Sequence, residues 1–288
     1  LSSLPECDAA FADLEISNVT LDFVLETGEL DSQEFMISNV GESGSIMYYS
    51  AGVSPFSVIG DGPDDFGNFW SDSDIDLELN IDWIDISNLG TQYSFPSNDI
   101  AGNPVEIGFN FPFLGESYSQ CIINPNGWIG FGSDSDEWEN TAIPASSAPG
   151  PAIFGLWDDL NPINGNCNSY CSGNVLYYTD GEKFIVTFDA VAHWWTNFED
   201  SYYTFQFILY PDGKIDLNYN TLTGTHAATV GIQNADGTSG MQVAFNQSYL
   251  HDALSLKISQ GPEWVSVTPS NGNVNAGSSE SLMVIVDA

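Results

Sequence analysis

Short runs in which apolar and polar residues alternate make up most of this chain, and Gly, Asn, Asp and Pro interrupt them at regular intervals. The apolar spacing of three and four residues that marks an amphipathic helix is nearly absent. Strict alternation instead places successive side chains on opposite faces of a β-strand. The sequence therefore predicts an all-β protein in which antiparallel sheets pack as β-sandwiches.

Two hairpins are the clearest of these patterns. Residues 201–220 contain two alternating runs joined by the turn Pro211–Lys214, and residues 174–178 and 184–188 flank the turn 179–182. Gly and Asp between two alternating runs are typical of tight turns. We expect each pair of runs to form neighbouring antiparallel strands.

Three regions follow an N-terminal leader, residues 1–14. Residues 15–59 and 259–288 both consist of short predicted strands, and the long block 60–258 between them is rich in Gly, Trp and Phe. In the two flanking regions the predicted strands are residues 19–25, 34–38, 45–49, 56–59, 264–269 and 282–286.

The two flanking regions resemble the two halves of one known repeat. Residues 34–44 (EFMISNVGESG) are similar to one half of the immunoglobulin-like, BACON-type repeats of secreted bacterial proteins. Residues 263–272 (EWVSVTPSNG) and 275–279 (NAGSS) are similar to the other half. The resemblance implies one immunoglobulin-like domain, residues 15–59 plus 259–288, that is split by an insertion.

The inserted block has a resemblance of its own. Residues 124–131 (NPNGWIGF), 153–160 (IFGLWDDL), 203–210 (YTFQFILY) and 230–234 (VGIQN) follow the order seen in nidogen-like domains. The resemblance implies a nidogen-like β-sandwich over residues 60–258. Known members of that family are adhesive or matrix-associated modules, which gives an expectation of function but no catalytic motif.

The end of the sequence raises a further expectation. Immunoglobulin-like modules of this type continue past the strand that here spans residues 284–288. We therefore expect either a truncated chain or an open sheet edge, which is a ready site for strand addition from another chain. The leader, with Leu4, Phe11 and Leu14 as apolar anchors, is a candidate donor strand, and packing on its own subunit is the alternative.

Charge limits the choice of partners. The chain has 40 Asp and Glu against 3 Lys and no Arg, so its formal net charge is −37. Such a charge repels nucleic acid and anionic lipid, and no apolar run approaches the roughly 20 residues of a membrane-spanning helix.

The chain begins at Leu1 like a mature, trimmed product, and the acidic surplus suits an extracellular or cell-surface location rich in counter-ions. Simple acidic solubility is the alternative.

The four cysteines of the chain favour an exported protein. Cys167 and Cys171 lie in one polar loop, and Cys7 and Cys121 remain as the other pair. We expect disulfides rather than a four-thiolate metal site because the spacings are not paired C-x-x-C motifs. The pairing itself stays open.

Two neighbouring acidic segments form a candidate calcium site, because calcium takes six to eight oxygen ligands. A merely solvated loop is the alternative, and in so acidic a chain two further runs, residues 134–139 and 158–159, show how easily such clusters arise. The candidate ligands are Asp61, Asp64, Asp65, Asp72, Asp74 and Asp76.

Catalysis has little support in the sequence. Asp158 and Asp159 are adjacent, so on a strand they would face opposite ways and could not act as an acid–base pair unless a loop changed their geometry. The three histidines lie far apart, and no nucleophile elbow or phosphate-binding loop is present. We therefore expect a non-enzyme, although a triad assembled only by the fold would escape detection.

Aromatic residues offer another kind of site. Trp194, Trp195 and Tyr202 are a candidate platform for stacking on sugar rings, whereas most large rings in sandwiches fill the core. The leading hypothesis is thus an exported, non-catalytic structural or adhesive protein that self-associates, or joins neighbouring surface proteins, through strand addition. The alternative is a carbohydrate-binding module of a larger secreted protein, with polysaccharide as its partner.

Overall fold

The structure is a computed structural model that describes residues 10–17, 20–57, 59–132, 135–163, 173–194, 201–224, 227–262 and 264–288. The described residues form 20 β-strands and no helix, which confirms the predicted all-β class. No described helix is therefore long and apolar enough to cross a membrane.

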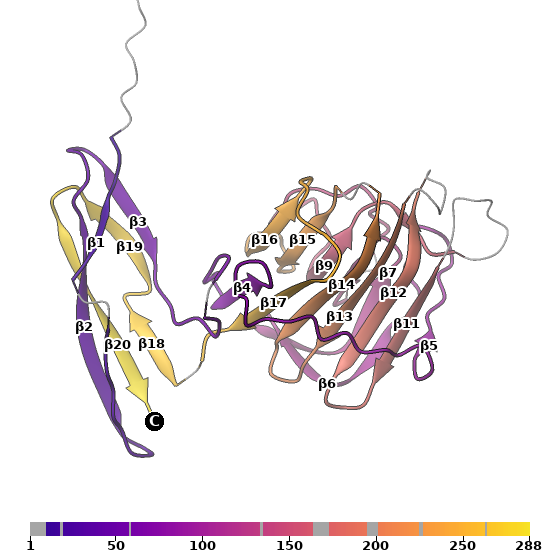
Figure 1. Cartoon of the computed structure of the whole chain (residues 1–288), viewed down its shortest axis with the longest axis horizontal. Coiled ribbons are helices and arrows are strands. Elements are labelled where there is room, and N and C mark those ends of the chain that lie inside the picture. Colours follow the sequence, from indigo (N-terminus) through magenta and orange to yellow (C-terminus); the bar gives the residue numbers. More distant parts are fainter. Residues whose placement is uncertain are drawn as a thin grey trace, which may run out of the picture. The chain divides into compact units, whose positions relative to one another are not determined.

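The chain divides into two compact units (Figure 1). Unit 1 comprises Leu1–Pro55 and Gly261–Ala288, and unit 2 comprises Phe56–Gln260. The predicted divisions were at 59/60 and 258/259, and the units divide at 55/56 and 260/261.

Unit 1 consists of one four-stranded and one two-stranded antiparallel sheet. The four-stranded sheet has the order β1 (Leu14–Ile16), β2 (Leu30–Asn39), β20 (Ser279–Asp287) and β18 (Val265–Thr268), and the smaller sheet pairs β19 (Asn271–Asn275) with β3 (Ile46–Ser50).

The core of unit 1 is small. Ile37 and Leu282 from the larger sheet pack against Met47 and Val274 from the smaller one. Ile16 lies directly opposite the buried Ile37 in the register of β1 and β2, so it shares the inner face, yet 44% of it is exposed. The two-stranded sheet therefore leaves part of this inner face uncovered.

Residues 20–25 follow the alternation predicted for a strand but lack a strand partner. Leu21, Phe23 and Leu25 are half-buried, and Val24 between them is 97% exposed. Among the described residues no backbone hydrogen bond joins this segment to a neighbouring strand. The strand expected at residues 56–59 is likewise not formed by the described residues of that range.

The described end of the leader is held by its own chain. Leu14 is the first residue of β1, the backbone N–H of Val40 donates to the carbonyl of Asp13, and the N–H of Glu42 donates to that of Phe11. Residues 1–9 lie outside the described residues.

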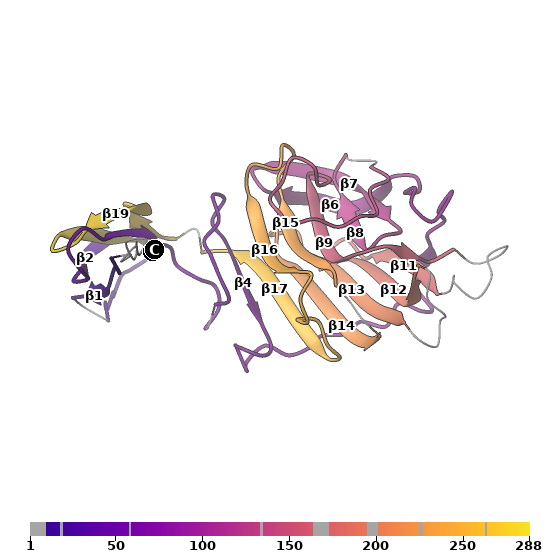
Figure 2. The same cartoon turned by 90° about the horizontal axis from the view of Figure 1, so that it is seen from above.

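Unit 2 is a sandwich of two larger sheets, which Figure 2 shows as two layers. One sheet has the order β4 (Asn68–Asp72), β17 (Leu254–Gln260), β14 (Ile215–Thr223), β13 (Tyr202–Leu209), β12 (Phe184–His193), β11 (Asn174–Thr179) and β5 (Thr91–Gln92), and β10 (Leu160–Asn161) also pairs with β12. The other has the order β16 (Gly240–Phe245), β15 (Thr229–Gln233), β9 (Ala152–Trp157), β8 (Trp128–Gly130), β7 (Glu116–Asn124) and β6 (Val105–Phe113).

Aromatic side chains fill the space between these sheets. Phe188 and Phe205 stack with their ring centroids 4.6 Å apart, and the hydroxyl of the fully buried Tyr219 donates a 2.6 Å hydrogen bond to the carbonyl of Gly155 in the opposite sheet. Both predicted hairpins are confirmed: β13 pairs with β14, and β11 pairs with β12.

One segment without regular structure crosses the outer face of the larger sheet on its way from β4 to β5 (Figure 1). The buried Gln206 side chain holds it there, since its Oε1 accepts the N–H of Ile84 and its Nε2 donates to the Ile84 carbonyl. A second bond runs from Asn218 Nδ2 to the carbonyl of Asp82. The side chains of Gln206 and Asn218 thus form hydrogen bonds with backbone groups of this segment, which lies across the face of the sheet and is not paired with a strand.

Candidate functional site: a polar cluster at the end of β9

A tight turn between β7 and β8 places a buried asparagine beside the end of β9. The N–H of Asn126 donates to Asn124 Oδ1 at 2.8 Å, and Gly127 adopts a φ of +81°. A Cβ at Gly127 would overlap the carbonyl oxygen of Leu156, so the turn requires glycine. Asn126 is fully buried as a result.

Asn126 in turn shapes the chain between β9 and β10. Its backbone carbonyl accepts the N–H of Asp158 at 3.3 Å, and its side-chain Oδ1 accepts the N–H of Leu160 at 3.0 Å. Asp158 and Asp159 therefore lie in a turn rather than on a strand. Their being neighbours in the sequence does not by itself reveal this geometry.

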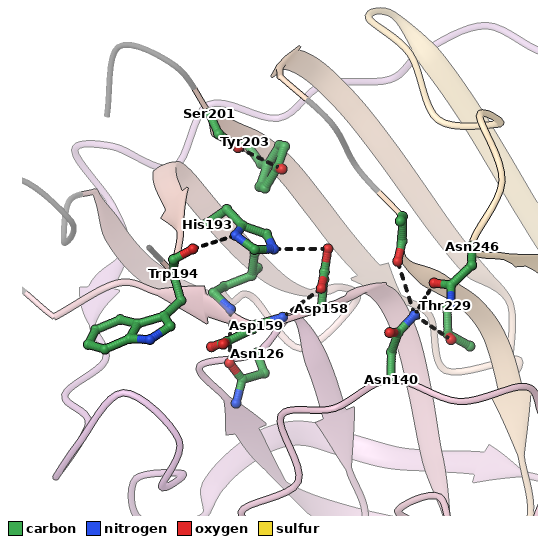
Figure 3. Close-up of polar contacts among 12 residues, drawn as sticks. Asn126, Asn140, Asp158, Asp159, His193, Trp194, Ser201, Tyr203, Thr229 and Asn246 are labelled. Carbon is green, nitrogen blue, oxygen red and sulfur yellow. Dashed lines mark hydrogen bonds and ion pairs between the residues drawn. The ribbon is translucent and has the colours of Figure 1, made fainter. Parts of the chain in front are cut away.

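Asp158 forms an ion pair with His193 at the end of β12 (Figure 3). Asp158 Oδ2 lies 3.3 Å from His193 Nε2, and His193 Nδ1 lies 2.6 Å from the carbonyl oxygen of Trp194. Both ring nitrogens thus face acceptors, and an imidazolium can donate to both. Burial opposes this charge, but the hydrogen bond and charge of Asp158, the Trp194 carbonyl and Asp159 together raise the pKa of His193.

Asp159 is the most perturbed carboxyl of the cluster. Burial, and to a lesser degree the charge of Asp99, raise its pKa to about 6 in spite of the opposing charge of His193. Burial also raises the pKa of Asp99, whereas the amides of Asn126 and Asn98 work against that rise. The two carboxyls and the Asn126 amide are therefore close enough to influence one another.

Three buried polar atoms of this group have no partner within ordinary hydrogen-bond distance among the described residues, although the Asn126 amide is near enough to the Asp99 carboxyl to oppose the rise in its pKa. They are Asp99 Oδ1, Asn126 Nδ2 and Asp159 Oδ1. A buried polar atom that stays unpaired costs roughly 1–3 kcal/mol, so native structures nearly always supply a partner. Water or a ligand group is the ordinary partner in such a place.

Neighbouring side chains fix the surroundings of the cluster. Ser201 Oγ donates to the Tyr203 hydroxyl at 2.8 Å, and burial raises the pKa of that tyrosine to about 12. On the other side, Asn140 Nδ2 bonds to Asn246 Oδ1 and Thr229 Oγ1 and ties the loop before β9 to β15 (Figure 3).

Most acidic residues of the candidate calcium site accept hydrogen bonds from their own turns or from the chain near Tyr249 and His251. Asp64 Oδ1 accepts the N–H groups of Phe66 and Asn68, and Asp72 accepts the hydroxyl of Tyr249. Asp72 also accepts the N–H groups of Asp74 and Ile75, Asp76 accepts that of Glu78, Asp74 pairs with His251, Asp61 accepts the N–H of Gly62, and Asp65 is exposed. Within the part of the chain that the structure describes, no three His, Cys, Asp or Glu side chains converge as metal ligands.

Only one cysteine lies in the described part of the chain. Cys121 on β7 is a buried free thiol there, and burial raises its pKa. Cys7, Cys167 and Cys171 lie outside the described residues, so the predicted disulfides remain a prediction.

The aromatic platform is described in part. Trp194 is half-buried and its backbone N–H donates to the Asp159 carbonyl at 2.7 Å, which places it in the polar cluster, and the half-buried Tyr202 starts β13. Trp195 lies outside the described residues. The sequence analysis singled out Trp194, Asp158 and Asp159. It missed Asn126, Asp99 and the role of His193, and of these only Asn126 lies in a recognisable turn sequence, Asn124–Gly127.

The fold and its core define unit 2 as an all-β sandwich without a closed barrel. The model of the NIDO-related family matches residues 80–276, more than half of the chain. The protein therefore belongs to the NIDO-related family, and the predicted nidogen-like β domain is confirmed. No solved structure matches the chain.

Proposed function

We propose that this protein is an exported, non-catalytic structural or adhesive protein whose copies assemble by β-strand addition at unit 1. The observation that carries the proposal is the incompletely covered inner face of the four-stranded sheet, where Ile16 and Leu14 remain 44% and 54% exposed. Apolar residues on the inner face of a sandwich are normally covered by the opposite sheet.

Exposed apolar side chains are concentrated on unit 1. Of the large hydrophobic side chains that are exposed among the described residues, most belong to this smaller unit: Phe11, Leu14, Ile16, Val24, Leu30, Met36, Val40, Ile46, Tyr48 and Trp264. Single exposed apolar residues are ordinary, but such a concentration on one small unit favours a protein–protein contact.

The acceptor we infer is the segment 20–25. Its side chains already alternate between half-buried and exposed, and its backbone groups have no strand partner among the described residues. An added strand would pair with those groups and place its own apolar side chains beside Phe23.

The donor we infer is the leader of a second copy. Residues 11–14 are bonded to residues 39–42 of their own chain, so we infer residues 1–9, which include Leu1 and Leu4, as the donor. A cell-surface array built in this way needs no partner other than the chain itself.

Charge sets a condition for assembly. Two chains that each carry −37 repel one another unless dissolved cations screen or bind their carboxylates. We therefore propose that salt, and calcium in particular, promotes assembly.

The test is negative-stain electron microscopy together with light scattering of residues 1–288 in millimolar calcium, and again after chelation. Ordered polymers are expected with calcium and fewer without it. Single particles under all salt conditions would refute the proposal.

A pair of variants separates strand addition from other contacts. Val24→Pro removes one backbone N–H from the acceptor segment, whereas Val24→Thr keeps it with a side chain of similar shape. We expect polymers with Val24→Thr and none with Val24→Pro or after deletion of residues 1–9. Unchanged polymers after that deletion would exclude the leader as the donor.

A further inference from the structure

A pocket of about 240 Å³ lies where the segment that crosses the outer face of the larger sheet meets strands β11 to β14. The segment contributes residues 83–87, and the strands contribute Leu176, Thr187, Asp189, Thr204 and Asn220. Asp189 and Asn220 are exposed, and Thr204 is half-buried. A ligand can therefore reach the pocket from solvent.

The outer face of β12 changes from apolar to polar at this place. Ile185, Thr187 and Asp189 share that face because side chains alternate along a strand. Ile185 packs against Ile86 of the crossing segment, whereas Thr187 and Asp189 line the pocket. The crossing segment thus covers the apolar part of the face and leaves Asp189 open to solvent.

Two β-bulges flank Thr204 at the pocket. Asp189 and Ala190 of β12 together lie opposite Thr204 of β13, and Asn220 is the extra residue of β14 on the other side. Ala190 takes a left-handed φ of +51°, which is unfavourable for a residue other than glycine, and its N–H donates to Thr204 Oγ1 at 3.0 Å. Bulges change the direction of side chains and are common next to functional sites. Both bulged positions, Asp189 and Asn220, line the pocket.

Four side chains of the pocket have bonding or stacking capacity that the protein does not use. Among the described residues, the Trp83 indole makes no hydrogen bond and stacks on no other ring, and neither the Asp189 carboxylate nor Asn220 Nδ2 has a hydrogen-bond partner. Thr204 Oγ1 accepts the Ala190 N–H, and its own hydrogen is left to donate. The pocket therefore presents N–H and O–H donors as well as a carboxylate acceptor.

This mixture of donors and acceptors decides the class of ligand. A hydroxyl group accepts from an N–H and donates to a carboxylate, so it satisfies both kinds of group. An ammonium ion would leave the donors of Trp83, Thr204 and Asn220 without an acceptor. An anion would be repelled by Asp189, by Asp85 at the same pocket and by a chain of net charge −37. The lining therefore favours a neutral molecule with several hydroxyl groups.

Trp83 and the volume of the pocket narrow this class further. Trp83 is half-buried, and an indole offers an apolar face for the C–H groups of a sugar ring. A volume of about 240 Å³ is below the roughly 300–1,000 Å³ of sites for drug-sized ligands. The pocket therefore has room for one sugar ring rather than for a stretch of polysaccharide chain.

We propose that Trp83, Asp189, Thr204 and Asn220 bind one neutral sugar residue, such as the end of a glycan. This inference goes beyond the proposed assembly and does not depend on it, because the pocket lies within unit 2 and the assembly contacts lie within unit 1.

The test uses residues 1–288 with a chelator, the condition in which we expect few polymers. Methyl glycosides of glucose, galactose, mannose, xylose, fucose and N-acetylglucosamine are screened by saturation-transfer difference NMR, and isothermal titration calorimetry gives the dissociation constant of each one that binds. The methyl glycoside of glucuronic acid is the anionic comparison. We expect at least one neutral glycoside to bind and the glucuronic acid glycoside not to bind.

Two variants locate the site, and each has a control of the same kind. Trp83→Ala and Asp189→Asn should each weaken binding by about tenfold or more, since they remove the stacking surface and the charged acceptor. Trp138→Ala removes a tryptophan of unit 2 that is 47% exposed, and Glu182→Gln removes an exposed carboxylate. Neither control residue lines the pocket, so both variants should leave binding unchanged.

Folding is checked by far-ultraviolet circular dichroism of each variant. Asp189 is exposed and Asp189→Asn keeps the shape of the side chain, so this variant tests the site even where Trp83→Ala unfolds. The proposal is overturned if none of the neutral glycosides binds, or if binding survives both Trp83→Ala and Asp189→Asn, because the sugar would then lie elsewhere. Neither result bears on assembly, which microscopy of the full chain tests separately.

Discussion

Asp216 on β14 lies directly opposite Lys257 on β17, and Lys257 Nζ is 3.3 Å from Asp216 Oδ2. Lys214 Nζ approaches the other oxygen, Oδ1, at 3.5 Å, and the Tyr210 hydroxyl donates a hydrogen bond to Oδ2 at 3.0 Å. Lys183 and Lys214 also lie over the ring of Tyr210. All three lysines of the chain thus gather around one tyrosine and one buried aspartate.

The first prediction concerns this group. Lys257→Met should lower the free energy of unfolding by about 1–3 kcal/mol, because Asp216 is only 1% exposed and would lose one of its two cations. Urea denaturation followed by tryptophan fluorescence measures the change.

Lys183→Met is the matched control, since it removes the same charge from the same patch without touching the carboxylate. Its cost should be about 0.5 kcal/mol or less. Equal losses in the two variants would mean that net charge, and not the pair with Asp216, determines the effect.

The second prediction is a pH dependence of stability. The pKa of Asp159 is raised to about 6, so the folded state binds a proton more tightly than the unfolded state, whose carboxyl titrates near its ordinary value. The free energy of unfolding should therefore rise as the pH falls through about 6. The raised pKa of His193 acts in the same direction, because its contribution is complete at low pH and is lost as the pH rises through the folded-state value.

Asp159→Asn isolates the carboxyl. At pH 7.5 the variant should be more stable than the parent by about 1–2 kcal/mol, a figure reduced for the partial exposure of Asp159, and the difference should vanish near pH 4. Urea midpoints between pH 4 and 8 test this. A difference that stays constant over that range would show that Asp159 has an ordinary pKa.

The third prediction concerns the turn that positions Asn126. Gly127→Ala should cost about 3 kcal/mol or more, because the new Cβ would overlap the Leu156 carbonyl at a φ of +81°. Gly181→Ala is the comparison: its φ is +90°, but no atom lies within 4 Å of the added Cβ. That variant should cost about 1–2 kcal/mol, the price of the left-handed conformation alone. Thermal unfolding compares the two, and similar losses would show that the close approach to Leu156 is not limiting.

Alternation along the chain predicted strands well but not their partners. The hairpin of β13 and β14 was predictable because its turn residues and both strands lie within 22 consecutive positions. Residues 20–25 show the limit of such reasoning: their alternate burial follows the predicted pattern, but the sequence does not say whether another strand lies beside them. Pairing depends on residues far away along the chain.

The polar cluster shows the same limit for a site. Asp158 and Asp159 were noticed as neighbours, and on a strand they would have faced opposite ways. Asn126 bends the chain around them, and it comes from a turn 34 positions before its side-chain partner Leu160. Asp99 and His193 arrive from still other elements, so only the folded sheets bring the donors and acceptors together.

The two crossings between the units lie at one edge of the larger sheet of unit 2. Gly60 donates its N–H to the Trp70 carbonyl on β4, and Trp70 in turn pairs with Ile258 on β17, two residues before the chain returns to unit 1. A pull applied to unit 2 through its two ends would therefore act on adjacent strands, and the pairing of β4 with β17 would bear it first. The polar cluster, which lies on strands farther from that edge, would keep its geometry.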